Sequence, residues 1–270
     1  MNQGGYALAL VKDVMLLPLA GYYLWNPLSW KDNKNENESV PILLIHGSGF
    51  NQSEWIIGRK HLMKKDCDKE TKTESQRDCD VVMKTEFQHS SNDTTRNVYS
   101  FDWDTSNESD IEHYTSHLEK KINEILETRP NRDIILIGHS MGGLMAGYYT
   151  EYIAKSARVN VLKVITIATP WQGTSALEPF VKIRSFLGLN EMAKRYQQML
   201  PNSLFLRELN EMIRDSTVPY MTIGSYHDLM VPYPSCHLES ARSKTTLWGL
   251  GHYSIIISST LWKHVCSDLN

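Results

Sequence analysis

The chain has 270 residues, of which 41% are hydrophobic and 22% charged, and its formal net charge is −3. This composition is typical of a globular protein with enough chain to bury a sizeable core, and one α/β domain of this length is common. Because there is no basic stripe and no acidic tail, nucleic acid is excluded as an expected partner.

Near the N-terminus lies an uncharged apolar run, residues 14–25, with the sequence VMLLPLAGYYLW. A membrane-spanning helix needs about 20 apolar residues, so this run is too short to cross a bilayer. No positively charged region precedes it and no clear cleavage site follows it, which argues against a secretory signal. Two interpretations stay open. The run is either a leading helix packed on the domain, or part of an interfacial segment, residues 14–30, in peripheral contact with a membrane through Tyr22, Tyr23, Trp25 and Trp30.

The segment 1–39 therefore divides into this apolar part and a solvated linker, residues 31–39, and the domain is expected over residues 40–270. A cytoplasmic or peripheral membrane location is favoured over secretion. Cys67 and Cys79 flank a very polar loop and fit a disulfide or two free thiols equally well. Chance accounts better than glycosylation for the N-x-[ST] sequons at Asn37, Asn51, Asn92 and Asn107.

Within the domain, short apolar runs alternate with stretches of helical periodicity. Strands are predicted at 42–46, 97–101, 134–137, 162–168, 220–223 and 245–248. Helices are predicted at 111–128 (capped by Ser109 and Glu112), 143–154, about 176–214 and 253–267. An exposed polar insertion is expected at about 64–95. This alternation predicts an α/β fold with a mostly parallel central sheet and helices on both faces.

Residues 138–142 read GHSMG and join the apolar run 134–137 to a predicted helix. A strand, G-x-S-x-G and a helix in this order predict a nucleophile elbow, in which the serine backbone is strained. Side chains at Gly138 and Gly142 would collide with the neighbouring strand and helix. The turn would present Ser140 Oγ at the C-terminal edge of the sheet and place a helix N-terminus beside a developing oxyanion.

A serine nucleophile needs a base and an acid, and in this fold they follow it in the order acid, then histidine. His252 in GLGHYS comes after a strand and before the last helix, which predicts a position at the active edge of the sheet. Asp228 follows the strand 220–223 and is the expected acid, since it would hold the imidazole tautomer. Glu211 and Asp215 are weaker candidates because they lie in the helical region.

The other downstream histidines are given no catalytic role. His237 stands in a polar loop and His264 in the last helix, so both are expected at the surface. His227, next to Asp228, is interpreted as a bystander.

An oxyanion hole needs two backbone donors, and one is expected from Met141, the residue after the nucleophile. The other is expected from Ser48 in the HGSGF segment that follows the first strand. A plain strand-ending turn is the alternative interpretation of that segment.

Taken together, these segments resemble the α/β-hydrolases, and among them the serine lipases and esterases, over about residues 40–268. The motifs that carry the resemblance are PILLIHGSGFNQSEW, IILIGHSMGGLMAGYY, VITIATPWQGTSA, MLPNSLFLRELN, TIGSYHDLMVP and LWGLGHYSIIIS. The resemblance implies hydrolysis of carboxylic esters through an acyl-enzyme, with no cofactor and no metal. Small bacterial triacylglycerol lipases and the lipase-like deacylases of GPI-anchor remodelling are the most similar sub-groups.

The substrate is less well specified than the fold. Lipid or small esters are expected, and the alternatives are a thioesterase or amidase, or a non-catalytic lipid-binding protein on a hydrolase scaffold. Phe50 and Trp171 are the expected substrate-binding residues, although Trp171 could simply pack. The helical region 176–214 is expected to form a lid, with Phe180, Ile183, Phe186, Leu187 and Leu189 either on its inner face or in an ordinary core.

Overall fold

The computed structural model describes residues 4–14, 39–63, 96–103, 109–188 and 190–269. The predicted insertion 64–95, nearly all of the segment 14–30, and both Cys67 and Cys79 lie outside the described residues. The described strands form one sheet of six, ordered β2-β1-β3-β4-β5-β6, in which all neighbours are parallel. Their bounds are β1 Ile42–Ile45, β2 Val98–Phe101, β3 Asp133–His139, β4 Asn160–Ile167, β5 Tyr220–Ser225 and β6 Ser243–Leu247.

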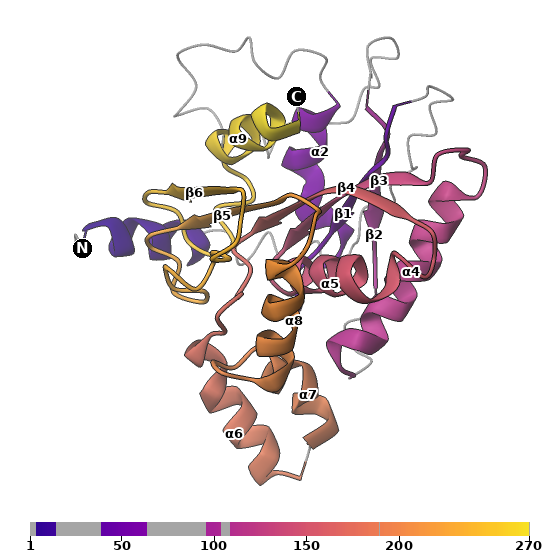
Figure 1. The fold of residues 1–270 in the computed structure, drawn as a ribbon. Helices are drawn as coiled ribbons and strands as arrows, with labels where there is room; N and C mark the ends of the chain where they lie inside the picture. The colour runs from indigo at the N-terminus through magenta and orange to yellow at the C-terminus, as the bar shows by residue number, and fades with distance from the viewer. Residues whose placement is uncertain (1–3, 15–38, 64–95, 104–108, 189, 270) are drawn as a thin grey trace.

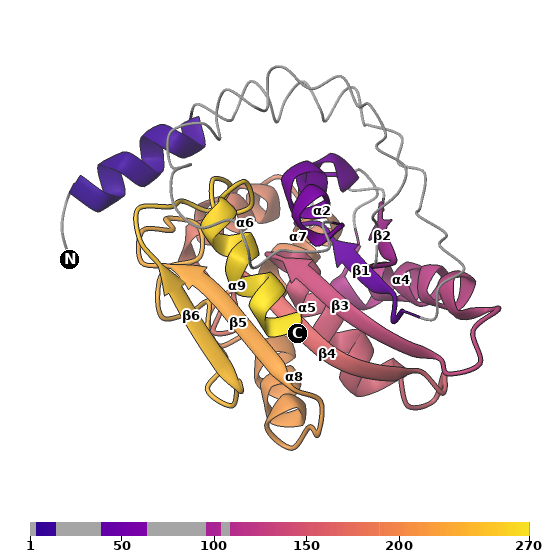
Figure 2. The ribbon, with the colours of Figure 1, turned by 90° about the horizontal axis from the view of Figure 1, so that it is seen from above.

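Helices cover both faces of the sheet, as expected for parallel strands made of continuous apolar runs (Figure 1). Side chains that alternate along β1 separate two cores: Leu43 and Ile45 belong to one, and Ile42 and Leu44 to the other. On one face lie α4 (Ile111–Leu126), α5 (Met141–Tyr148) and α8 (Leu204–Arg214). On the other lie α2 (Ile56–Leu62) and α9 (Ser259–Leu269), which Figure 2 shows in front of the strands. The predicted α/β class is confirmed.

Three details of the predicted helices are wrong, although the predicted start of the helix at Ile111 is confirmed. Asp110 rather than Ser109 caps α4, because the helix begins at Ile111 and the Asp110 side chain accepts a hydrogen bond from His113 N at 2.9 Å. The predicted helix 143–154 is α5 followed by one π-helical turn, η2 (Tyr149–Ile153). The last helix begins at Ser259 rather than 253, because residues 252–257 form turns.

The region 176–214 is helical but divides into parts with different environments. After the 3-10 turn η3 (Ser175–Leu177), helices α6 (Glu178–Phe186) and α7 (Asn190–Gln198) project away from the sheet (Figure 1). By contrast, α8 buries an apolar face, Leu206, Leu209 and Ile213, in the same core as α5. Thus α8 is part of the core, and the lid prediction applies to α6 and α7 alone.

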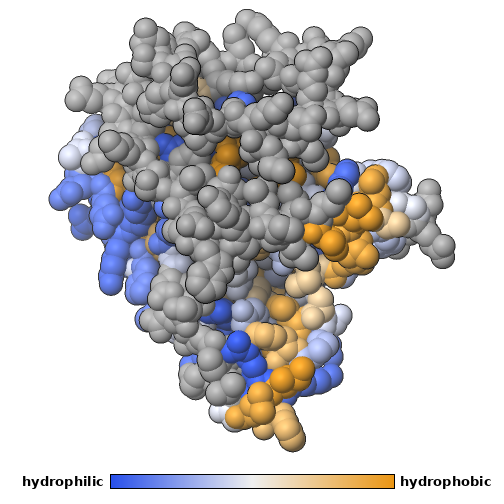
Figure 3. Space-filling view, turned by 180° about the vertical axis from the view of Figure 1, so that it is seen from behind, coloured by the Kyte–Doolittle hydropathy of each residue, from blue (hydrophilic) through white to orange (hydrophobic). Residues whose placement is uncertain are grey.

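Residues 4–14 form a helix that lies beside the end of the sheet where β5 and β6 are found (Figures 1 and 2). Its Ala9 is fully buried, whereas Leu8, Leu10, Val11 and Val14 are 42–54% exposed. Hydrophobic surface is visible on this helix and at the tip of α6 (Figure 3). In the described part of the chain, no helix has the length and hydrophobicity needed to cross a membrane.

Candidate active site

Ser140 stands on a strained turn between β3 and α5. Its φ of 51° and ψ of −124° are unusual for a residue with a side chain. Neighbouring backbone explains the glycines on either side: a Cβ on Gly138 would lie 2.5 Å from Gly142 C, and one on Gly142 would lie 2.3 Å from Ile45 O. The short contacts let α5 begin directly at the ends of β3 and β1. The local geometry is that of a nucleophile elbow.

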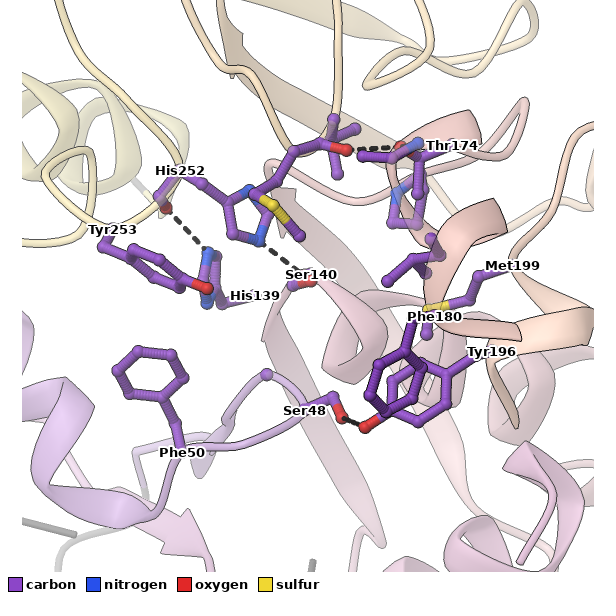
Figure 4. Close-up of a pocket in the computed structure, with 16 residues that line it drawn as sticks. Ser48, Phe50, His139, Ser140, Thr174, Phe180, Tyr196, Met199, His252 and Tyr253 are labelled. Atoms are coloured by element: carbon purple, nitrogen blue, oxygen red, sulfur yellow. Dashed lines mark hydrogen bonds between the residues drawn. The ribbon is translucent and has the colours of Figure 1, made fainter. Parts of the chain in front are cut away.

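The structure brings Ser140, His252 and Asp228 together in one hydrogen-bonded chain. Ser140 Oγ lies 3.1 Å from His252 Nε2 (Figure 4), and His252 Nδ1 lies 2.8 Å from Asp228 Oδ2. The second Asp228 oxygen accepts hydrogen bonds from Met230 N and Val231 N, both at 2.8 Å. An ionised Asp228 accepts from Nδ1–H, which leaves Nε2 free to accept the Ser140 hydroxyl proton.

His252 is 4% exposed and is surrounded by carboxylates. Burial by itself lowers the pKa of an imidazole, but the charge and hydrogen bond of Asp228, with further negative charge from Asp13 and Glu54, outweigh burial. The pKa of His252 is therefore raised above its ordinary value. A raised pKa makes His252 a stronger base, as proton abstraction from a serine requires.

Both residues predicted to supply oxyanion donors lie next to Ser140, Met141 in sequence and Ser48 in the loop after β1. Met141 is the first residue of α5, and N–H groups in the first turn of a helix have no acceptor within the helix. Ser48 follows Gly47, where a Cβ would lie only 3.1 Å from the Ser140 Cβ, so the loop approaches the elbow closely. The Ser48 hydroxyl lies 3.4 Å from Tyr196 Oη of α7 (Figure 4). That these N–H groups bind an oxyanion stays a prediction.

A cavity of about 320 Å³ opens at Ser140 and His252. Most of its walls are apolar, and η3, α6 and α7 contribute one side through Leu177, Phe180 and Tyr196. Phe50 also lines it, with its ring centroid 5.0 Å from that of Tyr253. The remaining apolar lining comprises Pro170, Ala176, Met199, Met230 and Val231.

Trp171 is a correction to the sequence prediction, because it packs in the core and is not part of the cavity lining. Its side chain is fully buried, with the ring edge-on to Tyr220 and Nε1 donating to Thr166 Oγ1 at 3.1 Å. A fully satisfied indole under α5 has no surface left for a substrate.

Of the residues proposed for an inner lid face, Phe180 alone among the described ones lines the cavity. Ile183, Phe186 and Leu187 are 60%, 89% and 60% exposed. Leu189 lies outside the described residues.

The other histidines divide as follows. His264 is exposed, as predicted. His237 is 6% exposed, which corrects the prediction: its ring nitrogens lie 2.9 Å from Thr222 Oγ1 and 2.8 Å from Thr246 Oγ1, so β5 and β6 bury it as a satisfied polar group. His227 accepts a hydrogen bond from Gly249 N at 3.0 Å, outside the Ser140 chain.

Three residues near the site were missed. His139, in the elbow itself, lies against Glu54 of the 3-10 turn η1 (Gln52–Trp55), with His139 Nδ1 2.6 Å from Glu54 Oε1. Asp13, from the N-terminal helix, accepts from Ser254 N at 2.8 Å. For His139 the sequence held a weak signal, namely a histidine at the end of an apolar strand. Glu54 and Asp13 reach the site through contacts between segments that are distant in sequence, and such contacts leave no signal in the sequence.

The chain matches the model of the family described as PGAP1-like alpha/beta domain over residues 36–265. The chain belongs to the PGAP1-like α/β domain family. A search of curated protein sequences gives no match. In the part of this family member that the structure describes, no group of His, Cys, Asp or Glu has the arrangement of a metal site.

Solved structures share the fold at low sequence identity. A gene product of Listeria innocua matches with a TM-score of 0.58 and 17% identity, covering 86% of this chain and 94% of that one. The mature form of Bacillus licheniformis lipase BlEst2 matches with a TM-score of 0.57 and 16% identity, and the match covers 89% of this chain and 95% of that one. A lipase-esterase related protein from Clostridium acetobutylicum matches with a TM-score of 0.53 and 14% identity, and the match covers 86% of this chain and 95% of that one. These similarities establish an α/β-hydrolase fold.

Proposed function

We propose that this protein is a serine hydrolase that cleaves carboxylic esters, with lipid esters as its substrates. The observation that carries the proposal is the hydrogen-bonded chain from Ser140 through His252 to Asp228, which begins at a mostly apolar cavity. A strained serine, a base with a raised pKa and a fixed carboxylate are the parts that acyl transfer needs. The lipase and esterase names among the structural relatives agree with it.

In the first half of the reaction, His252 Nε2 takes the Ser140 proton as Oγ attacks the ester carbonyl carbon. The carbonyl oxygen becomes an oxyanion, which the N–H groups of Ser48 and Met141 stabilise. When the carbon–oxygen bond to the alcohol breaks, His252 gives its proton to the leaving oxygen. Water then repeats the sequence on the acyl-enzyme, releasing the acid and restoring Ser140.

The cavity walls support an acyl chain as the part of the substrate that is bound. A volume of about 320 Å³ is at the lower end of the range of ligand pockets, roughly 300–1,000 Å³. Leu177 and Phe180 line it together with Met230 and Val231, and such side chains offer few hydrogen bonds to a headgroup. The apolar walls therefore favour the hydrocarbon part of an ester.

Exposed apolar side chains on the surface support a lipid source for that ester. Phe186 and Leu187 at the end of α6 are 89% and 60% exposed, and the helix of residues 4–14 presents another apolar strip (Figure 3). Apolar side chains gathered at a surface are typical of proteins that contact membranes or other proteins. We therefore propose α6 and α7 as the lid and a peripheral membrane contact that includes residues 14–30.

The test is hydrolysis of p-nitrophenyl esters from butyrate to palmitate, with a thioester and an anilide of the best acyl chain added. Ser140→Ala is the inactive variant, and Ser156→Ala, an exposed serine on the turn after η2, is the matched control. Labelling with a fluorophosphonate reports the nucleophile without depending on the substrate. The expected result is ester turnover and labelling that both disappear in Ser140→Ala and persist in Ser156→Ala.

Each other outcome has a defined meaning. Turnover of the thioester or anilide in place of esters would move the assignment to a thioesterase or amidase. Labelling of Ser140 without turnover would leave the nucleophile correct and the substrate wrong. Neither labelling nor turnover, with lipid vesicles present, would contradict the enzyme proposal and favour a lipid-binding protein.

A further inference from the structure

Two buried side chains beside the triad have no role in the proton transfers above. His139, the residue before Ser140, has a side chain that is 1% exposed, and the Glu54 side chain is 4% exposed. Their closest atoms, His139 Nδ1 and Glu54 Oε1, are 2.6 Å apart. Burying a carboxylate is costly unless it is paired and receives hydrogen bonds, so this pair needs a structural or functional explanation.

The far ends of both side chains bind the backbone of other active-site loops. Glu54 Oε2 accepts a hydrogen bond from Gly47 N at 3.2 Å, one residue before the proposed oxyanion donor Ser48. His139 Nε2 lies 3.1 Å from the carbonyl oxygen of His252, the proposed base (Figure 4). A carbonyl oxygen can only accept, so Nε2 carries the hydrogen and donates it.

The contacts therefore run as one chain from Gly47 N–H through Glu54 and His139 to the His252 carbonyl. It joins the loop after β1, the elbow after β3 and the loop after β6, three segments far apart in sequence. Packing follows the same path, because a Cβ on Gly47 would be 3.0 Å from His139 Nδ1. None of these contacts involves the atoms of Ser140 and His252 that exchange the proton.

We propose that Glu54 and His139 are positioning residues, which together set the distance between the oxyanion loop, the nucleophile and the base. This inference rests on the proposed function of the Ser140 site. The lengths of the two side chains matter for this role. The Glu54 carboxylate contacts both Gly47 N and His139 Nδ1, and the His139 ring then contacts the carbonyl oxygen of His252. A misplacement of about 1 Å among reacting groups can lower the rate roughly 10²-fold, which is the size of effect expected when the link is cut.

The test compares Glu54→Ala, Glu54→Asp and Glu54→Gln. Ala removes the link and should lower kcat by about 10²-fold with KM unchanged, because the groups are misplaced while the cavity is intact. Asp keeps the charge but is one methylene too short to hold both partners, so its kcat should be reduced as well. Gln keeps the length, with an oxygen for Gly47 N–H and an NH₂ for Nδ1, and should restore most of kcat.

The matched control is Glu151→Ala. Glu151 accepts a hydrogen bond from Tyr220 Oη at 2.6 Å, and Tyr220 begins β5, at the edge of the sheet opposite the active site. This variant should lose stability, as Tm will show, while its kcat stays at the wild-type value. The His139→Ala variant combined with Glu54→Ala should cost no more than either alone, because both cut the same link.

A kcat order of Glu, Gln, Asp, Ala, with non-additive Glu54 and His139 effects, supports the proposal. If Glu54→Ala does not fold, the Glu54→Asp and Glu54→Gln variants still test the proposal. A higher kcat in Glu54→Asp than in Glu54→Gln would mean that the charge of the side chain matters rather than its length, and would overturn the proposal. Wild-type kcat in Glu54→Ala, or additive losses in the double variant, would also overturn it. The wild-type fluorophosphonate reaction separates these results from failure of the proposed function, since it is measured before any Glu54 variant.

Discussion

Replacing Gly142 by alanine tests whether the elbow depends on direct backbone contact. The new Cβ would lie 2.3 Å from Ile45 O and 2.6 Å from His46 O. Ordinary van der Waals contact begins at 3.4 Å, so α5 would be about 1 Å too close to the end of β1. Both obstructing atoms are backbone, and Ile45 is held in the ladder with β2 and β3, so no side-chain rotation relieves the overlap.

The first turn of α5 must therefore move away from β1. Overpacking of this kind costs about 1–3 kcal/mol, which corresponds to a fall in Tm of roughly 2–12 °C for a domain of this size. The same movement separates Ser140 and Met141 from the oxyanion loop, and a shift near 1 Å lowers kcat by about 10²-fold. Thermal denaturation and ester hydrolysis well below Tm measure the two effects separately.

Gly147→Ala is the control on the same helix. Its Cβ would meet side chains rather than backbone, with Trp171 Cη2 at 2.8 Å and Ile213 Cδ1 at 3.4 Å, so the buried indole must shift while the backbone of the elbow stays in place. The gain of about 1 kcal/mol in helix propensity from glycine to alanine offsets part of that cost. Its kcat should equal that of the wild type. Equal kcat values for Gly142→Ala and Gly147→Ala would show that contact between α5 and β1 does not position the nucleophile.

Two further predictions concern the base. Asp228→Asn should lower kcat by about 10⁴-fold with little change in KM, because the amide no longer selects the Nδ1–H tautomer of His252; steady-state kinetics check this, and a loss below tenfold would speak against Asp228 as the acid. Burial lowers the pKa of His252, and the carboxylates of Asp228, Asp13 and Glu54 together raise it by more. His139 is the basic side chain in contact with Glu54. Activity should fall as the pH drops through the raised pKa of His252, and Asp13→Asn, which keeps an oxygen for Ser254 N, should move the acid limb of kcat/KM to lower pH. If the midpoint of the acid limb in Asp13→Asn stays at the wild-type pH or moves to higher pH, the role of Asp13 in raising the pKa of His252 is contradicted.

Local signals in the sequence were sufficient for the elements that carry the site. Four consecutive buried residues in β1 and the GHSMG segment between β3 and α5 have distinctive patterns over a few residues. The loops that carry Asp228 and His252 were placed correctly because each follows a strand, and parallel strands bring their C-terminal ends to one edge.

Predictions that depended on the surroundings of one side chain did less well. Trp171 and His237 were expected to be accessible because of their neighbours in sequence, but both are buried. Thr166 accepts the hydrogen bond of the Trp171 indole, and Thr222 and Thr246 bind the two ring nitrogens of His237. Likewise, the spacing of apolar residues over 176–214 could not separate α8, which packs on α5, from α6, whose Phe186 faces solvent.

The sequence by itself determined the parallel α/β architecture, the elbow, and His252 and Asp228 as the members of the hydrogen-bonded chain that starts at Ser140, because each depends on short-range periodicity, turn geometry and strand order. Tertiary structure alone decided that Glu54 reaches His139 and that Asp13 reaches the loop of His252. The contact between the buried Glu54 and His139 side chains, and the contact of Asp13 with Ser254 across 241 positions, depend on distances between segments that folding brings together. Residue type and spacing carry no record of those distances.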